Sequence, residues 1–153
     1  MFSHQWLGWE EPDPKNVHYT AMVLATDGVV IQMQWSMQNV YLWVDYHSVP
    51  QRNRAMQALA IITLPCFASL SSIMVIVAPD TTYVDTKLVC DFETYSRRMC
   101  CWAEVFSFYC RRDLEDMYKA DKDGAFYKLH KVEEHQVHDL GIRRGLHMLC
   151  AEA

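Results

Sequence analysis

Small and polar side chains stand at the ends of two apolar runs, where they could approach a ligand. Ser3, His4 and Trp6 follow the first run, and Asp45 ends a later one. In α/β folds, ligands bind beyond the carboxyl ends of the strands. There Ser3 and His4 could contact a ribose or phosphate, Trp6 could stack on a base, and Asp45 could hold a ribose hydroxyl. The structural alternatives are that Trp6 covers the end of the sheet, His4 faces solvent and Asp45 caps the backbone that follows it.

Histidines and carboxylates gather near the end of the sequence. Glu134, His135, His138 and Asp139 include i,i+3 and i,i+4 pairs, and His130 precedes them by about one turn of a helix. Such spacing can bind zinc. A hydrated helix surface explains the same pattern, and we therefore predict no metal site here.

Six cysteines are scattered along the chain, and no two have C-x-x-C spacing. This pattern predicts free thiols in a reducing cytosol rather than a disulfide framework. The adjacent pair Cys100 and Cys101 is reactive if a helix start lowers a thiol pKa, and inert if it is buried. The first residues have no basic region followed by an apolar one, which predicts no signal peptide and a cytoplasmic protein.

Alternating strand and helix signals predict the elements that position these residues. This order predicts an α/β fold, a short parallel sheet with helices on both faces. The first strand is expected to be the end of a longer one whose beginning the sequence lacks. The predicted strands are Met1–Trp6, Val40–Val44 and Ile73–Val77, and the predicted helices are Pro14–Ala25, Arg52–Thr63 and most of Phe92–Tyr118.

Local signals set the predicted boundaries. Asp13 can cap the first helix, Pro14 suits its first position, and Thr26-Asp27-Gly28 is expected to end it. Pro79–Asp91 is predicted to be a loop, and the last long helix is expected to break near Arg112.

One uncharged stretch, Ala58–Ala78, is long enough to cross a bilayer. Pro65 stands within it, and several serines follow. Its first half repeats apolar residues at helical spacing, whereas Ile73–Val77 is a short β-rich run. A helix followed by a buried parallel strand explains both halves, so we predict no membrane span.

Length and charge limit the remaining possibilities. A chain of 153 residues without an internal repeat is predicted to form a single domain, residues 1–153. A formal charge of −5 argues against a generic nucleic-acid partner.

Five segments in this order resemble a known family. They read FSHQW, PDP, LWVDYHSVPQ, SSIMVIVAP and YSRRMCCWAE, and they span Phe2 to Glu104. Together they are similar to TIR-like proteins, closest to the group that includes the heterokaryon-incompatibility (HET-type) domains. Residues 105–153 are outside the resemblance and are expected to be a helical C-terminal part.

The resemblance implies a flavodoxin-like, three-layer TIR fold and the cleavage of NAD between nicotinamide and ribose. NAD is then the substrate, and no other cofactor is expected. Glu104 matches the catalytic glutamate of the family's W-C-x-x-E motif. Cys100 stands where the family has Trp, so Trp102, two residues later, is the remaining candidate for ligand stacking. The resemblance also implies a homo-oligomer, and the alternative function is a non-catalytic protein–protein interaction module.

A lone carboxylate suits this chemistry. Nicotinamide leaves as a neutral molecule, so no general acid is needed. An ionised Glu104 could stabilise an oxocarbenium-like ribose and hold its hydroxyls. The alternative is a salt bridge from Glu104 to Arg97, Arg98 or Arg111.

Overall fold

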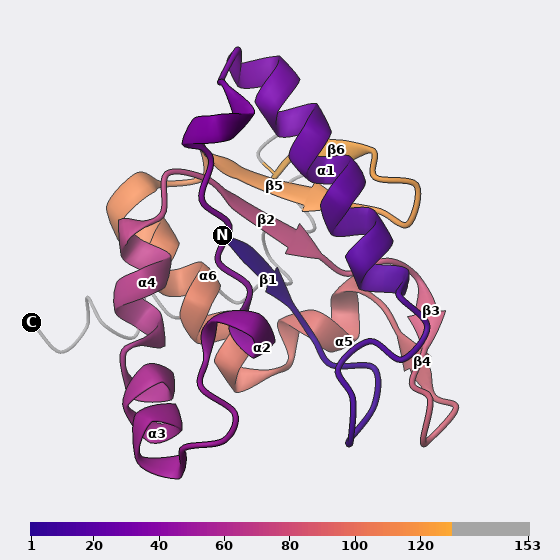
Figure 1. Cartoon of the computed structure of the whole chain (residues 1–153). Helices are drawn as coiled ribbons and strands as arrows, with labels where there is room; N and C mark the ends of the chain where they lie inside the picture. Colours follow the sequence, from indigo (N-terminus) through magenta and orange to yellow (C-terminus); the bar gives the residue numbers. More distant parts are fainter. Residues whose placement is uncertain (130–153) are drawn as a thin grey trace, which may run out of the picture.

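A four-stranded, mostly parallel sheet forms the centre of the protein in a computed structural model, which describes residues 1–129 (Figure 1). The strand order is β1-β2-β5-β6, and only β6 runs antiparallel to its neighbour. The strands are β1 (Phe2–His4), β2 (Met74–Val77), β5 (Met117–Ala120) and β6 (Phe126–Lys128).

Helices cover both faces of this sheet and complete the predicted three-layer α/β architecture (Figure 1). On one face, α1 packs its Ala21, Ala25 and Val29 against Val75 and other strand residues. The opposite face carries α4, α5 and α6, whose buried residues pack on alternate positions of the same strands. The helices are α1 (Val17–Met33), α2 (Asp45–Ser48), α3 (Arg54–Ile62), α4 (Leu64–Leu70), α5 (Phe92–Ser96) and α6 (Met99–Arg112), with a 3-10 turn at Met37–Asn39.

The first helix starts later and ends later than the sequence predicts. Asp13 does cap it, because its carboxylate accepts the backbone N–H groups of Val17 and Tyr19 at 2.9 and 2.7 Å. The expected stop at Gly28 is wrong, and α1 continues to Met33. Gly28 is there for packing, since a Cβ at this position would stand 2.3 Å from the Phe126 ring.

The predicted strand Val40–Val44 is wrong in its extent. Only Val44 forms a bridge, to Phe2 of β1, and the Phe2 N–H donates to the carbonyl of Trp43 at 2.9 Å. The segment still follows the outer edge of β1 in a parallel sense. Because β1 has only three residues, it offers too little backbone for a longer ladder.

The uncharged stretch divides as predicted into helix and strand. It forms α3, α4 and the fully buried β2. Pro65 lies in the first turn of α4, where its missing N–H costs no hydrogen bond. Within residues 1–129, no helix combines the length and the apolar character needed to cross a membrane.

The second half contains strands that the sequence did not reveal. The helical prediction is wrong after Arg112, where Asp113 ends α6 at φ 59° and β5 follows. The expected loop Pro79–Asp91 contains the antiparallel pair β3 (Thr81–Thr82) and β4 (Val89–Cys90).

Candidate functional site

Glu104 lies in the interior of the protein, beside the first strand. The buried residues of α6 are Cys101, Glu104, Val105 and Phe108. The last three follow Cys101 by three, four and seven residues, so all four lie on the face of the helix that packs against the sheet. The Glu104 side chain is 5% exposed, whereas charged residues are rarely this deeply buried. An acidic residue at a core position of an amphipathic helix therefore calls for a specific explanation.

A chain of hydroxyl groups binds the Glu104 carboxyl. Ser3 Oγ donates a hydrogen bond to Glu104 Oε2, and the Ser3 and Tyr95 hydroxyls lie 2.6 Å apart. Since the Ser3 proton is directed at the carboxyl, Tyr95 must donate to Ser3. The hydrogen bonds thus join β1, α5 and α6 around one acid group.

Burial raises the pKa of Glu104 to about 8, and the negative charge of Asp45 acts in the same direction. The hydrogen bond from Ser3 opposes this shift, because it favours the ionised form. The free protein therefore holds Glu104 mostly protonated at pH 7. Such perturbed acids concentrate at functional sites.

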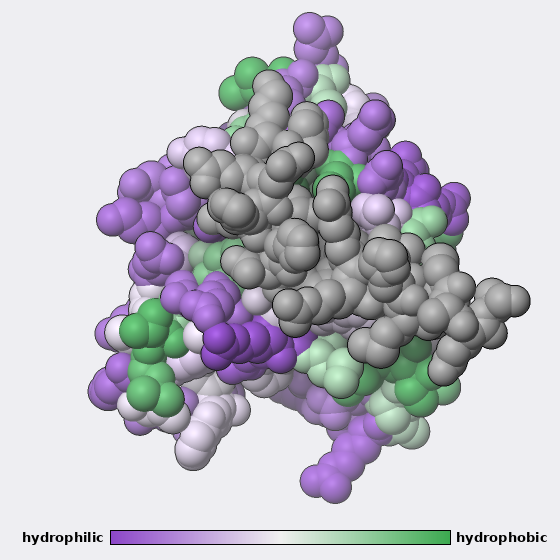
Figure 2. All heavy atoms as spheres, turned by 180° about the vertical axis from the view of Figure 1, so that it is seen from behind, coloured by the Kyte–Doolittle hydropathy of each residue, from purple (hydrophilic) through white to green (hydrophobic). Residues whose placement is uncertain are grey.

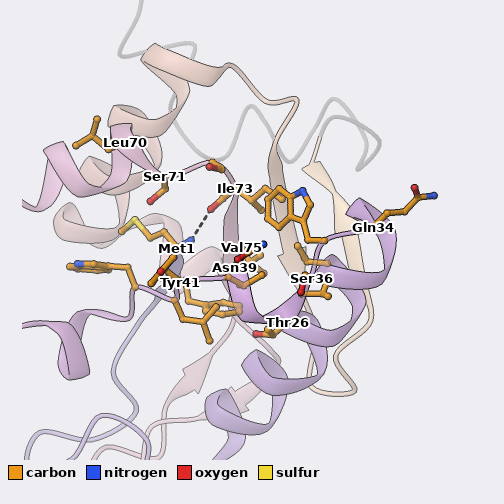
Figure 3. A pocket seen from close by; sticks show the side chains of 18 residues that line it. Met1, Thr26, Gln34, Ser36, Asn39, Tyr41, Leu70, Ser71, Ile73 and Val75 are labelled. Carbon is orange, nitrogen blue, oxygen red and sulfur yellow. Dashed lines mark hydrogen bonds between the residues drawn. The ribbon is translucent and has the colours of Figure 1, made fainter.

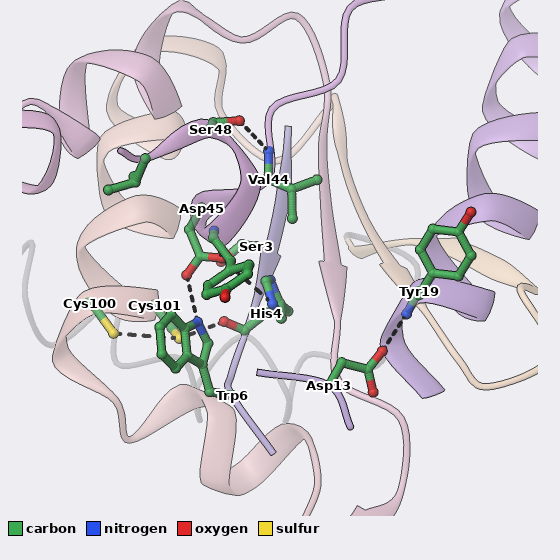
Figure 4. Close-up of polar contacts among 12 residues, drawn as sticks. Ser3, His4, Trp6, Asp13, Tyr19, Val44, Asp45, Ser48, Cys100 and Cys101 are labelled. Carbon is green, nitrogen blue, oxygen red and sulfur yellow. Dashed lines mark hydrogen bonds and ion pairs between the residues drawn. The ribbon is translucent and has the colours of Figure 1, made fainter. Parts of the chain in front are cut away.

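Asp45 is held by two of the residues that the sequence singled out (Figure 4). Trp6 donates its indole N–H to Asp45 Oδ2 at 3.0 Å, and His4 Nε2 lies 3.6 Å from Oδ1. Burial lowers the pKa of His4, although Asp45 partly offsets this effect. His4 is 7% exposed, so the alternative in which it faces solvent is wrong. The Asp45 carboxylate accepts the N–H of Tyr46, the next residue, but the N-cap position of α2 is Val44 and Asp45 does not accept the N–H groups of His47 or Ser48.

These side chains border one cavity of about 280 Å³ at the carboxyl end of β1. Glu104, His4, Trp6 and Asp45 line it, and Ser3 lies behind Glu104. In α/β folds, ligands bind beyond the carboxyl ends of the parallel strands. A shallower hollow of about 590 Å³ adjoins it and shares four lining residues with it: Ile61, Leu64, Arg98 and Cys100.

Two neighbouring cysteines differ in environment (Figure 4). Their sulfur atoms lie 3.9 Å apart. Cys100 is exposed, and the hydrogen bond from Cys101 lowers its thiol pKa to about 6. Cys101 is buried, and its pKa is raised. Cys101 thus has the buried environment predicted for an inert thiol, whereas the pKa of Cys100 is lowered mainly by its neighbour Cys101, which is not the helix-start effect that the sequence suggested.

Trp102 stands apart from this group. Its ring stacks on Phe106 at a centroid distance of 4.9 Å, and it does not line the cavity. The ion pairs within residues 1–129 also leave Glu104 out, since Arg97 pairs with Glu93 and Arg112 with Asp116. In this part of the chain, the alternative of a Glu104 salt bridge is therefore wrong.

The sequence did not indicate Tyr95, and it indicated Arg98 only as one possible salt-bridge partner of Glu104. Tyr95 is fully buried and supplies the hydroxyl behind Ser3. Arg98 borders both hollows and lies over the Tyr83 ring at 5.2 Å. Both belong to the YSRRMCCWAE segment, but an isolated aromatic or arginine at a helix end has no spacing pattern that marks it.

A second large cavity, of about 590 Å³, lies near the opposite end of β1 (Figure 3). Met1, Trp35, Tyr41, Ser71 and Ile73 are among its lining residues. Its described lining contains no acidic, basic, histidine or cysteine side chain. It therefore offers less for catalysis than the cavity at Glu104.

No group of three or more potential ligands is arranged to hold a metal ion in residues 1–129. The histidine-rich cluster at Glu134–Asp139, with His130, lies outside the described residues. Comparisons with protein-family models, curated proteins and solved structures gave no match, so the assignment of function depends on the site itself.

Proposed function

We infer that the protein cleaves NAD between nicotinamide and ribose, with Glu104 as the catalytic carboxyl. The observation that carries this inference is a buried acid at the carboxyl edge of a parallel sheet, hydrogen-bonded by Ser3 and opening into a cavity beside Asp45 and Trp6. The resemblance of Phe2–Glu104 to TIR-like proteins points to the same reaction and the same residue.

The reaction can proceed with one carboxylate. The bond between ribose C1′ and the pyridinium nitrogen breaks, and its electron pair leaves with neutral nicotinamide. Water then adds to C1′ and loses a proton, which yields ADP-ribose. The positive pyridinium ring favours the ionised form of Glu104, because an opposite charge nearby lowers the pKa of a carboxyl. The substrate thus creates the anion that stabilises the oxocarbenium-like transition state.

The sizes of the two hollows fit a divided binding mode. An apolar cavity of 150 Å³ holds benzene, so 280 Å³ corresponds to about eleven non-hydrogen atoms. That volume accepts the nicotinamide ring and part of its ribose. The remainder of the dinucleotide is larger than the adjoining hollow and would extend through it onto the surface, passing Arg98, whose guanidinium can bind the pyrophosphate.

Nicotinamide release from NAD by the purified protein tests this function. We expect turnover in the wild type and a loss of at least about 100-fold in Glu104→Gln, because the amide cannot ionise. Glu93→Gln is the matched control, since Glu93 is exposed on α5 and pairs only with Arg97 in the described residues. Equal turnover in the wild type and Glu104→Gln would contradict the proposal.

One observation favours the alternative function, a non-catalytic interaction module. Helix α3 exposes an unusual number of large apolar side chains, between 50 and 73% of each: Met56, Leu59, Ile61 and Ile62. Figure 2 shows hydrophobic side chains gathered at the edge of the molecule where α3 lies (lower right). Contiguous apolar surface of this kind marks interaction sites.

Self-association through α3 reconciles this surface with catalysis. Ile61 of α3 lines both the Glu104 cavity and the adjoining hollow. A second copy seated on α3 would therefore narrow the entrance around the bound NAD, while the water that adds to C1′ still reaches the site. Oligomer formation, implied by the resemblance, becomes a requirement for activity.

A further inference from the structure

Another cavity, of about 240 Å³, lies on the other side of His4, between α1 and residues 42–47. Its lining is mostly apolar, with Met22, Leu42 and Val44 among its residues. Two buried histidines, His4 and His18, also line it. It is separate from the Glu104 cavity, because His4 is the one residue that lines both in the described part of the chain.

The two histidines have unusual surroundings. His18 is 1% exposed, and neither of its ring nitrogens has a hydrogen-bond partner within residues 1–129. The same holds for Nδ1 of His4. Burial lowers the pKa of His18 to about 3, so the ring is neutral at pH 7. A buried polar group without a partner destabilises the folded state, so the protein retains these groups at the expense of stability.

The hydrogen-bonding requirement of the cavity follows from His4. Its Nε2 lies 3.6 Å from the Asp45 carboxylate, which favours the tautomer with the proton on Nε2. Nδ1 is then an acceptor. His18, as a neutral ring, can donate from one nitrogen. The two ring centroids lie 5.4 Å apart in an edge-to-face contact, so the rings touch each other and an amide group would have to reach both of them from the cavity side.

We propose that this cavity is a second ligand site, which binds a small, neutral aromatic amide or lactam. The ligand's N–H donates to His4 Nδ1, its carbonyl oxygen accepts from His18, and its ring packs on the apolar lining. The volume corresponds to about ten non-hydrogen atoms by comparison with benzene in a 150 Å³ cavity. Because the site shares only His4 with the Glu104 cavity, this proposal does not depend on NAD cleavage.

A matched pair of probes tests the proposal by titration calorimetry or ligand-observed NMR. Oxindole has ten non-hydrogen atoms with an N–H beside a carbonyl, and 2-indanone has the same shape and carbonyl but no N–H. We expect oxindole to bind the wild type about tenfold more tightly than 2-indanone, the value of one hydrogen bond. Equal affinities, or no binding of either compound at millimolar concentration, would overturn the proposal.

Two variants locate the site. His18→Leu keeps the approximate size of the side chain and removes the donor, so oxindole affinity should fall about tenfold. The Tm of this variant should stay the same or rise, because two buried ring nitrogens without partners are removed and only Nδ1 of His4 remains. Glu104→Gln should bind oxindole as the wild type does. Loss of binding in Glu104→Gln, or full binding in His18→Leu, would show that the probe occupies another place.

Discussion

The protonation of Glu104 makes the free energy of unfolding depend on pH. Burial raises its pKa from 4.5 to about 8, so the folded protein keeps a proton that the unfolded chain releases above pH 4.5. Unfolding then releases a proton, and stability falls as the pH rises from about 4.5 to 8. We expect the unfolding free energy of the wild type to fall relative to Glu104→Gln by a few kcal/mol between pH 5 and pH 8.5.

Denaturant unfolding of both proteins at a series of pH values measures this difference. Glu93→Gln, at an exposed position, should follow the wild-type curve. A constant difference between the wild type and Glu104→Gln over this range would mean that the Glu104 carboxyl is already ionised in the free protein.

The buried His18 lowers the free energy of unfolding at acid pH, whereas Glu104 lowers it at alkaline pH. Its pKa is lowered from 6.5 to about 3 by burial and by the neighbouring His4. The unfolded chain therefore binds a proton below pH 6.5 that the folded protein does not, and stability falls as the pH falls toward 3. His18→Leu should flatten this acid limb in urea titrations between pH 4 and 7. An unchanged acid limb would place the responsible groups elsewhere.

At the scale of elements, Gly28 shows how packing overrides local preference. Alanine favours a helix by about 1 kcal/mol over glycine. A Cβ at Gly28 would nevertheless stand 2.3 Å from the Phe126 ring, where β6 crosses α1. We expect Gly28→Ala to destabilise the fold by about 1–3 kcal/mol, the cost of overpacking.

The thermal unfolding of four proteins separates the two effects. In a Phe126→Ala background, Gly28→Ala should become neutral or stabilising, because the clash is gone. Asp27→Ala, at an exposed position next to Gly28 on α1, is the control for propensity alone. Stabilisation by Gly28→Ala in the wild-type background would mean that the Phe126 ring moves away from the new methyl group at no cost in free energy.

The same competition explains which elements could be predicted from the sequence. A continuous apolar run identified β2, and apolar residues at helical spacing identified α3. Val40–Val44 has strand-forming residues, but it lacks a partner of sufficient length. The short β5 lies in a segment predicted to be helical, and it forms a strand between β2 and β6. Long-range pairing, which local residue patterns do not contain, decided both cases.

Some residues of the candidate site could likewise be predicted from the sequence, and one could not. Ser3, His4, Trp6, Asp45 and Glu104 come together at one sheet edge, as strand-end positions require. The contacts of Trp102, by contrast, depend on the rotation of α6, which turns its ring onto a neighbour on the same helix. A shift of two residues along a helix changes the direction of a side chain by about 200°, so Trp102 could not take the place of a Trp at position 100.

At the scale of the whole molecule, the exposed apolar side chains of α3 bear on both assembly and access to Glu104. Leu59 is 56% exposed on one side of α3, and Ile61, two residues later and therefore on a different side of the helix, lines the cavity entrance. Leu59→Lys should prevent self-association, because a dimer would bury the added charge without a partner. Leu88→Lys is the matched control, since Leu88 is equally exposed but lies in the β3–β4 turn, far from α3 (Figure 1).

Sedimentation velocity together with the NAD assay separates assembly from catalysis. The wild type and Leu88→Lys should form a species of at least twice the monomer mass at tens of micromolar, and Leu59→Lys should remain monomeric. If a second copy closes the site, Leu59→Lys also loses NAD turnover while it keeps the wild-type Tm. A monomeric Leu59→Lys with full turnover would mean that α3 assembles the protein without contributing to catalysis. If the wild type is monomeric, the apolar side chains of α3 are not a self-association surface. That result would favour the alternative function, a non-catalytic module that binds a different protein through α3.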